Sequence, residues 1–262
     1  MTLPVVVALH GNPETPVIWE PLIAELGRLN PDRRVITPQL PGFGCVAPAG
    51  FSATKEEYAA WFATTLEAIV AEHGPVDLLS HDWGGGIAMR VVSTHPQLVR
   101  SWASDVLGLF HADYVWHDFA QIWQTPDAGE QYFEQNAATS VEERVATYEM
   151  IGIPRSTGER LVADTGGDAA TEMARCILAL YRSAAQPAMV AWGKELGPAA
   201  TRPGLAIIAP LDPFVRGLDL AGEVAAELGA ATVEMEGQGH WWMLGDPVSA
   251  AAHLERFWSE RP

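Results

Sequence analysis

One stretch in the middle of the chain decides the fold: Leu79-Ser80-His81-Asp82-Trp83-Gly84-Gly85-Gly86-Ile87-Ala88-Met89. A short apolar run leads into it, a helix-compatible run leads out, and a glycine-supported turn carries Asp82 at its tip. This layout predicts a nucleophile elbow, a sharp strand-to-helix turn that exposes one side chain above a sheet. Small residues stand two positions before and after such a nucleophile, as Ser80 and Gly84 do for Asp82. The predicted nucleophile is therefore a carboxylate, and Ser80 is excluded because Asp82, two positions after it, is not small.

Six apolar runs predict strands, and helical patterns separate them. The predicted strands are 5–9, 34–37, 76–80, 99–106, 205–209 and 232–235. The predicted helices of the same part are 19–29, 54–72, the helix that follows the elbow, 218–228 and 247–258. Strands that alternate with helices indicate an α/β protein with a doubly wound, mostly parallel sheet.

This alternation breaks between Phe110 and Thr201, where the sequence carries helical patterns and no convincing strand pattern. The helices expected there are 116–123, 129–138, 141–150, 158–163, 169–183 and 187–194. We therefore expect an all-helical insertion of residues 110–201 in a core domain formed by residues 1–109 and 202–262.

Composition limits the possible partners and location. The 262 residues include 33 acidic and 16 basic ones, for a formal charge of −17. Since no basic stripe is present, we expect no binding to nucleic acid or to a membrane. No apolar run approaches the length of a membrane span, and no signal-peptide pattern opens the chain. The two cysteines, Cys45 and Cys176, lack metal-ligand spacing, so we predict a cytoplasmic protein without a metal site. The oligomeric state, monomer or homodimer, stays open.

Three further motifs follow predicted strands. His10-Gly11-Asn12-Pro13 follows the first strand, Asp212-Pro213 follows the fifth, and Gly239-His240 follows the last. With Asp82 they give the chain order nucleophile, acid, histidine, which is that of the α/β-hydrolases. On these motifs the chain resembles the α/β-hydrolase family over essentially its whole length, and the insertion resembles that family's helical cap domain.

Within this family, His81-Asp82-Trp83-Gly84-Gly85 resembles epoxide hydrolases and haloalkane dehalogenases. The resemblance implies that Asp82 displaces a leaving group from a saturated carbon and forms an alkyl-enzyme ester. It also implies that Asp212 holds His240, which activates a water molecule to hydrolyse this ester. The backbone N–H groups of Asn12 and Trp83 are the expected oxyanion hole. No cofactor is implied.

The two activities differ in the leaving atom, and the sequence carries signs of both. Tyr181, in Leu180-Tyr181-Arg182, resembles a cap tyrosine that gives epoxide hydrolases their proton donor, and Phe119 falls where a second tyrosine often lies. Trp241, after the histidine, also resembles epoxide hydrolases. Asn12 instead resembles dehalogenases, where this asparagine and the tryptophan after the nucleophile hold the halide. We favour epoxide opening on three features against one, with a haloalkane dehalogenase that uses Asn12 and Trp83 as the alternative.

Other interpretations concern the acid, the pocket and the class of protein. Asp105, at the end of the fourth strand, is a rival to Asp212 because some dehalogenases carry their acid there. The expected partner is a small hydrophobic molecule in a pocket lined by Phe119, Trp116, Trp123 and Trp241. A non-catalytic protein of the same fold that binds such a ligand is the alternative to an enzyme. His81, His95, His111 and His117 are expected to be structural, and Gly84-Gly85-Gly86 to permit close backbone approach rather than to bind phosphate.

Overall fold

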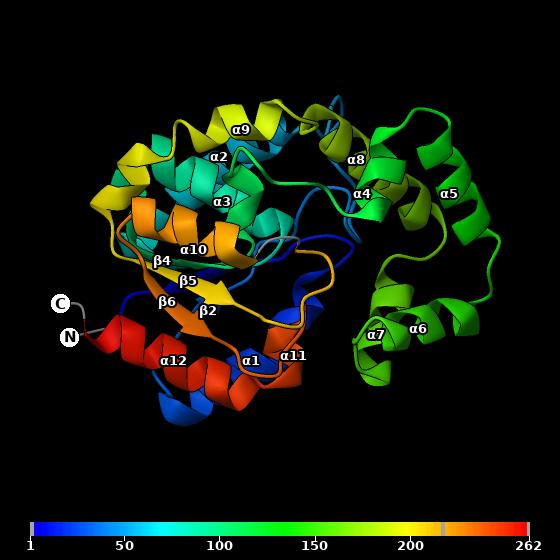
Figure 1. Ribbon diagram of the computed structural model, residues 1–262. Helices are drawn as coiled ribbons and strands as arrows, with labels where there is room; N and C mark the ends of the chain where they lie inside the picture. Colours follow the sequence, from blue (N-terminus) through cyan, green and yellow to red (C-terminus); the bar gives the residue numbers. More distant parts are fainter. Residues whose placement is uncertain (1–2, 216–217, 261–262) are drawn as a thin grey trace.

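The computed structural model describes residues 3–215 and 218–260, which form a layered core with a helical block at one end (Figure 1). Six strands make one sheet in the order β2-β1-β3-β4-β5-β6, and every neighbouring pair is parallel. Their bounds are β1 Val6–Leu9, β2 Val35–Ile36, β3 Val76–Ser80, β4 Val99–Ser104, β5 Gly204–Ile208 and β6 Ala231–Glu234. The predicted parallel sheet is confirmed.

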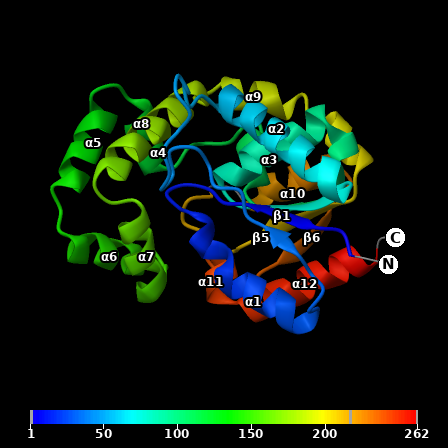
Figure 2. The same cartoon turned by 180° about the vertical axis from the view of Figure 1, so that it is seen from behind.

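Helices cover both faces of this sheet, which makes it doubly wound (Figures 1 and 2). One face carries α2 (Lys55–His73), α3 (Trp83–Thr94), α9 (Ala188–Gly193) and α10 (Leu218–Glu227), and the other carries α1 (Glu20–Leu29), α11 (Trp242–Gly245) and α12 (Pro247–Ser259). The residues of β1 are at most 1% exposed. Burial on both faces explains why this strand reads as a continuous apolar run instead of an alternating one.

The helical insertion lies beyond the carboxyl ends of the strands (Figure 1). It contains α4 (Asp118–Gln124), α5 (Ala128–Ala137), α6 (Val141–Met150), α7 (Arg155–Asp164) and α8 (Asp168–Ser183). The predicted insertion, residues 110–201, extends too far, because α9 and the short helix Gly197–Thr201 lie on the core. There the Trp102 indole N–H donates to the carbonyl oxygen of Ala199 over 3.3 Å. None of the described helices is long and apolar enough to cross a bilayer.

The fourth strand ends two residues earlier than the sequence predicts, at Ser104. Val106 has a φ of 54°, a left-handed conformation that is rare for a β-branched residue. This residue turns the chain out of the sheet and into the short helix Leu107–Phe110. As a result Asp105 sits at the strand end, where its Oδ1 accepts a hydrogen bond from the Asp82 backbone N–H over 2.9 Å.

Candidate active site

The elbow between β3 and α3 places Asp82 in a strained conformation. Its φ of 50° and ψ of −123° belong to a region that costs a residue other than glycine about 1–3 kcal/mol. Close packing maintains it. A Cβ atom on Gly84 would overlap the carbonyl oxygen of Leu9, and one on Gly11 would overlap the Asp82 side chain. Close approach of the backbone therefore explains Gly84, as predicted. It does not explain Gly86, where a Cβ atom would lie 3.5 Å from the nearest atom, an ordinary van der Waals contact.

Asp82, Asp212 and His240 come together as the sequence predicts. The Asp212 Oδ2 lies 2.7 Å from the Nδ1 of His240, and the Nε2 of His240 lies 3.9 Å from the Oδ2 of Asp82. The other Asp82 oxygen, Oδ1, accepts a hydrogen bond from the Asn12 backbone N–H over 2.8 Å. One carboxylate oxygen is thus fixed by the backbone, and the other faces the histidine.

The charges in this group shift one another's ionisation. Burial raises the pKa of Asp82 to about 6, although the neighbouring histidines oppose the shift. Burial alone would lower the pKa of His240, but the charge and hydrogen bond of Asp212, together with the charge of Asp82, raise that pKa overall. Conversely, His240, together with the backbone N–H of Phe214 and the charge of His81, outweighs burial at Asp212 and lowers the pKa of its carboxyl group. His240 is therefore a stronger base than an exposed histidine, which suits proton abstraction from water.

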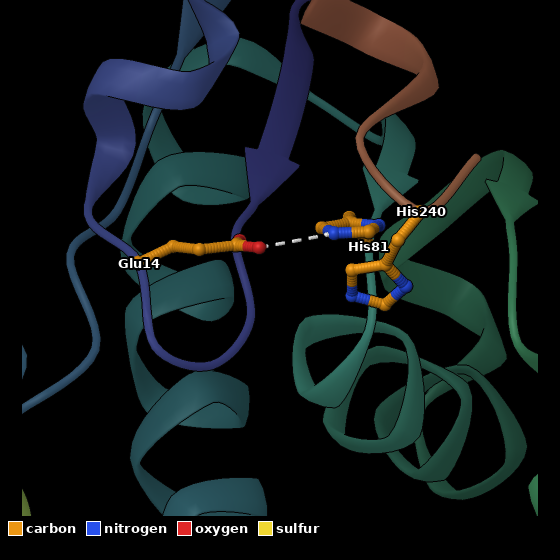
Figure 3. A group of neighbouring side chains, drawn as sticks. All are labelled: Glu14, His81 and His240. Atoms are coloured by element: carbon orange, nitrogen blue, oxygen red, sulfur yellow. Dashed lines mark hydrogen bonds and ion pairs between the residues drawn. The ribbon is translucent and has the colours of Figure 1, made fainter. Parts of the chain in front are cut away.

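Asp105, the rival acid, serves another histidine. Its Oδ2 lies 2.5 Å from the Nδ1 of His81 and accepts a hydrogen bond from the Trp242 indole over 2.7 Å. The Nε2 of His81 lies 3.2 Å from a carboxylate oxygen of Glu14 (Figure 3). These two carboxylates outweigh burial and raise the pKa of His81 well above 6.5. Geometry therefore assigns Asp212, and not Asp105, to His240.

Glu14 was not predicted from the sequence, yet it lies beside both histidines (Figure 3). It is fully buried and accepts hydrogen bonds from the Gly11 N–H over 3.1 Å and from the Trp241 indole. The neighbouring histidines, His81 first and then His240 and His10, together outweigh burial and lower the pKa of Glu14 to about 2. Single atoms of Glu14, His81 and His240 lie within 4.8 Å of one another. Both ring nitrogens of His81 already face carboxylates, so this group is not suited to bind a metal ion, which needs a free nitrogen lone pair.

The helical insertion α4–α8, called the cap below, contributes Tyr181, from α8. Tyr181 contacts Asn12, and these two residues favoured different leaving groups in the sequence. Tyr181 is 2% exposed, and its hydroxyl oxygen accepts a hydrogen bond from the Asn12 side-chain amide over 3.3 Å. The Trp83 ring meets the Tyr181 ring edge to face, with centroids 5.2 Å apart. Burial raises the pKa of Tyr181 well above 10, so its hydroxyl keeps its proton.

A cavity of about 170 Å³ lies between the core and the cap, and Asp82 and His240 face it. Three of the predicted pocket residues, Phe119, Trp123 and Trp241, line this cavity. Trp116 does not. It stacks on Trp83 with ring centroids 5.8 Å apart and lines a smaller recess beside the cavity. Trp116 therefore supports the Trp83 ring instead of facing the main cavity.

Other residues that line the cavity are His117, Arg144, Tyr148 and Phe214, which the sequence did not single out as site residues. His117 also has the structural role predicted for it, because its Nδ1 accepts a hydrogen bond from the Ala120 N–H over 3.2 Å at the start of α4. These side chains come from loops and cap helices without a recognisable motif, so only the folded chain identifies them.

Comparison with known proteins agrees with this geometry. Residues 6–253 match the model of the alpha/beta hydrolase family, and the chain belongs to that family. It is 28% identical over 134 residues to a haloalkane dehalogenase of Mesorhizobium japonicum, a match that covers 49% of this chain and 38% of that protein. It is 30% identical over 93 residues to the 2-hydroxymuconate semialdehyde hydrolase of a Pseudomonas species, covering 35% of this chain and 32% of that one.

The fold is similar to that of solved dehalogenases. The haloalkane dehalogenase DbeA of Bradyrhizobium elkanii superposes with a TM-score of 0.72 over 98% of this chain and 92% of its own, at 24% identity. The sequence matches above span only about a third of the length of the relatives. The comparisons therefore establish the family and the fold, with dehalogenases among the similar proteins.

Proposed function

We propose that this protein is a hydrolase of the haloalkane dehalogenase type, which acts on a small apolar substrate through an ester on Asp82. The observation that carries the proposal is the arrangement at Asp82. One carboxylate oxygen is held by the backbone N–H of Asn12, the other faces His240, and Asp82 and Asn12 both line the cavity. The similarity to dehalogenases favours a halide over the epoxide that the sequence alone favoured.

The first step uses the free oxygen of Asp82. Because the Asn12 N–H holds Oδ1, Oδ2 attacks the saturated carbon. The new carbon–oxygen bond forms as the carbon–halogen bond breaks, and the bonding pair leaves with the halide. The side chains of Asn12 and Trp83 are the proposed hydrogen-bond donors to that anion. Such donors stabilise developing charge without reorganisation, because the fold holds them in place.

The second step hydrolyses the ester. The gap of 3.9 Å between His240 and Asp82 marks where a water molecule enters beside the histidine. The Nε2 of His240 removes a proton from this water as its oxygen attacks the carboxyl carbon of Asp82. The Oδ1 oxyanion keeps its hydrogen bond from Asn12. Collapse of the intermediate breaks the bond between the carboxyl carbon and the alkoxy oxygen, which takes the proton from His240 and leaves as the alcohol. The Asp82 carboxylic acid that remains then loses the second proton of the water to the solvent, which restores the carboxylate.

Epoxide opening is the second candidate, and Tyr181 is the observation that favours it. Since the Asn12 amide donates to the Tyr181 oxygen, the hydroxyl proton of Tyr181 is free to be donated to a leaving oxygen. An alkoxide needs this proton, whereas a halide needs only hydrogen bonds. The non-catalytic alternative leaves unexplained why His240 has one nitrogen bound to Asp212 and the other directed at Asp82.

Replacement of His240 tests the proposal, because the ester then forms but is not hydrolysed. The His240→Gln variant is incubated separately with 1-bromobutane and with styrene oxide, and its intact mass is measured. We expect the bromoalkane to add one butyl group, and peptide mapping to find it on Asp82. The Asp82→Ala/His240→Gln double variant is the control. An adduct from the epoxide alone would replace the halide proposal by the second candidate, and no adduct from either would support the binding protein.

Replacement of Tyr181 by phenylalanine separates the two leaving groups. Loss of a general acid costs about 10²–10⁴-fold in rate, so epoxide turnover should fall by that factor if Tyr181 protonates the alkoxide. Bromoalkane turnover should change by less than about tenfold, the typical effect of one hydrogen bond. The measurement is kcat for each substrate in both proteins. A collapse of bromoalkane turnover would show that Tyr181 is also needed when a halide leaves.

A further inference from the structure

The cavity carries a cation from the cap in addition to the Asp82 carboxylate. Arg144, on α6, lines it together with Thr147 and Tyr148 of the same helix. Apart from histidines, Asp82 and Arg144 are the charged side chains among the described residues that line the cavity. Most of the rest of the wall is apolar or aromatic. A molecule that fills the cavity therefore meets a nucleophile on the core and a permanent positive charge on the cap.

Arg144 has no ion-pair partner in the described part of the chain, although three glutamates lie on the same helix. Two of them, Glu142 and Glu149, pair with Arg155 over 2.8 and 3.0 Å. The third, Glu143, accepts hydrogen bonds from the backbone and hydroxyl of Ser140, each over 2.7 Å. The nearby negative charges are thus already engaged outside the cavity, which leaves Arg144 available to a ligand.

The arginine also has unused hydrogen-bonding capacity. Its Nε is buried and has no hydrogen-bond partner in the structure. A guanidinium group offers five N–H donors and no acceptor, and most buried donors in proteins are satisfied. An anion with two oxygens suits this group best, because a carboxylate pairs with two parallel N–H groups of an arginine. A ligand carboxylate would satisfy this Nε.

The structure ties α6 to the nucleophile. The Tyr148 hydroxyl donates to the carbonyl oxygen of Pro13 over 3.2 Å, next to Asn12, whose N–H holds Asp82. Arg144 precedes Tyr148 by four residues, so the two side chains lie on one face of the helix, about 5–6 Å apart at Cβ. Helix α6 is thus tied to the segment that holds Asp82, and Arg144 and Asp82 both line the cavity.

We propose that Arg144 binds the carboxylate of the substrate, and that the substrate class is haloalkanoates with the halogen at the end of the chain remote from the carboxylate. The substrate class rests on the function proposed above, whereas carboxylate binding does not. The apolar wall accepts the methylene chain, and Arg144 orients it so that the halogen-bearing carbon lies at Asp82. The formal charge of −17 disfavours anions in general, so this arginine provides a local site for one.

Binding tests the proposal without any turnover. Tryptophan fluorescence, which Trp123 and Trp241 report from the cavity wall, is titrated with hexanoate and with 1-hexanol. Wild-type protein should bind hexanoate more tightly than hexanol. Arg144→Gln should weaken hexanoate binding by about 10–100-fold, the effect of a lost hydrogen bond to a charged group, and should weaken hexanol binding by much less. Arg144→Lys should retain part of the preference. The matched control is Arg28→Gln, which removes an exposed arginine of α1 and should have no effect. Equal loss for both ligands, or none, would overturn the proposal.

Turnover then tests the substrate class. The substrates 6-bromohexanoate and 1-bromohexane are compared by their kcat/KM values in wild-type and Arg144→Gln protein. We expect the acid to be preferred over bromohexane in the wild type and this preference to disappear in the variant. Turnover of bromohexane without any preference for the acid would refute the substrate class and leave the dehalogenase proposal standing. Absence of any alkylation with intact hexanoate binding would refute the dehalogenase proposal and the substrate class, but keep Arg144 as a carboxylate site.

Discussion

Two histidine–aspartate pairs lie side by side beneath the cavity, and they differ in what their second nitrogen contacts. The ring centroids of His240 and His81 are 4.5 Å apart. His240 binds Asp212 through Nδ1 and directs Nε2 at Asp82. His81 binds Asp105 through Nδ1, but Glu14 meets its Nε2. The same pair of residue types thus produces a base with a free nitrogen in one case and a closed charge network in the other.

The comparison teaches that a third residue decides the role of each pair. Asp105 and Glu14 together raise the pKa of His81, and a protonated histidine cannot act as a base. The Nε2 of His240 instead faces Asp82, whose Oδ2 lies 3.9 Å away, beyond hydrogen-bonding distance, so this nitrogen stays accessible. Asp105 instead holds the elbow, since it accepts the Asp82 N–H. We therefore propose that the Asp212 pair serves catalysis and the Asp105 pair supports the elbow.

Replacement of Asp212 should have the largest effect, and on activity. In Asp212→Asn the histidine loses the charge that orients it and stabilises its protonated form. Comparable changes in catalytic triads lower kcat by about 10⁴-fold. We expect a loss of about 10³–10⁴-fold in steady-state turnover per folded molecule. Turnover within tenfold of the wild type would show that Asp212 is not the acid.

Replacement of Asp105 should act on stability instead. Asp105→Asn leaves the buried His81 charge with one carboxylate fewer, and breaking a buried ion pair costs about 3–5 kcal/mol. Chemical denaturation should show a loss of this order in the free energy of unfolding. Turnover per folded molecule should fall less than in Asp212→Asn. If Asp105→Asn were the less active and the more stable of the two variants, the assignment of the pairs would have to be exchanged.

The smallest of the expected effects is a shift in pH dependence. The ordinary pKa of an aspartate is 3.8, and burial raises that of Asp82 to about 6. The carboxylate is the reactive form, so protonation removes activity as the pH falls through 6. We expect kcat/KM, which reports the free protein, to be flat above this pH and to fall roughly tenfold per unit below it. A profile that stays flat down to pH 4 would show that Asp82 is not buried in the way described.

Residues at strand ends could be predicted from the sequence, and this accounts for most of the core. The elbow and the motifs that carry Asn12, Asp212 and His240 each follow an apolar run, so a local pattern locates them. The choice between Asp105 and Asp212 could not be made in this way, because both end a strand. It depends on which histidine each one meets, and that is a property of the folded chain.

The cap was the harder part to predict. Its helices follow from periodicity, but α9 was assigned to it although that helix lies on the core, because a short apolar helix reads alike in both places. Glu14, Arg144 and Tyr148 belong to no motif, and only tertiary contacts reveal them. The leaving group could not be predicted either, because Asn12 and Tyr181 favour different chemistries and contact each other in the structure.

The origin of the oxygen in the product tests the central claim, that Asp82 forms a covalent ester. Excess wild-type protein is allowed a single turnover of 1-bromobutane in heavy-oxygen water, and both the alcohol and the Asp82 peptide are analysed by mass spectrometry. Water attacks the carboxyl carbon in the proposed mechanism, so the alcohol should carry ordinary oxygen from Asp82, and the peptide should gain the heavy isotope. Heavy oxygen in the alcohol of the first turnover, with an unlabelled peptide, would show direct attack by water and contradict the account.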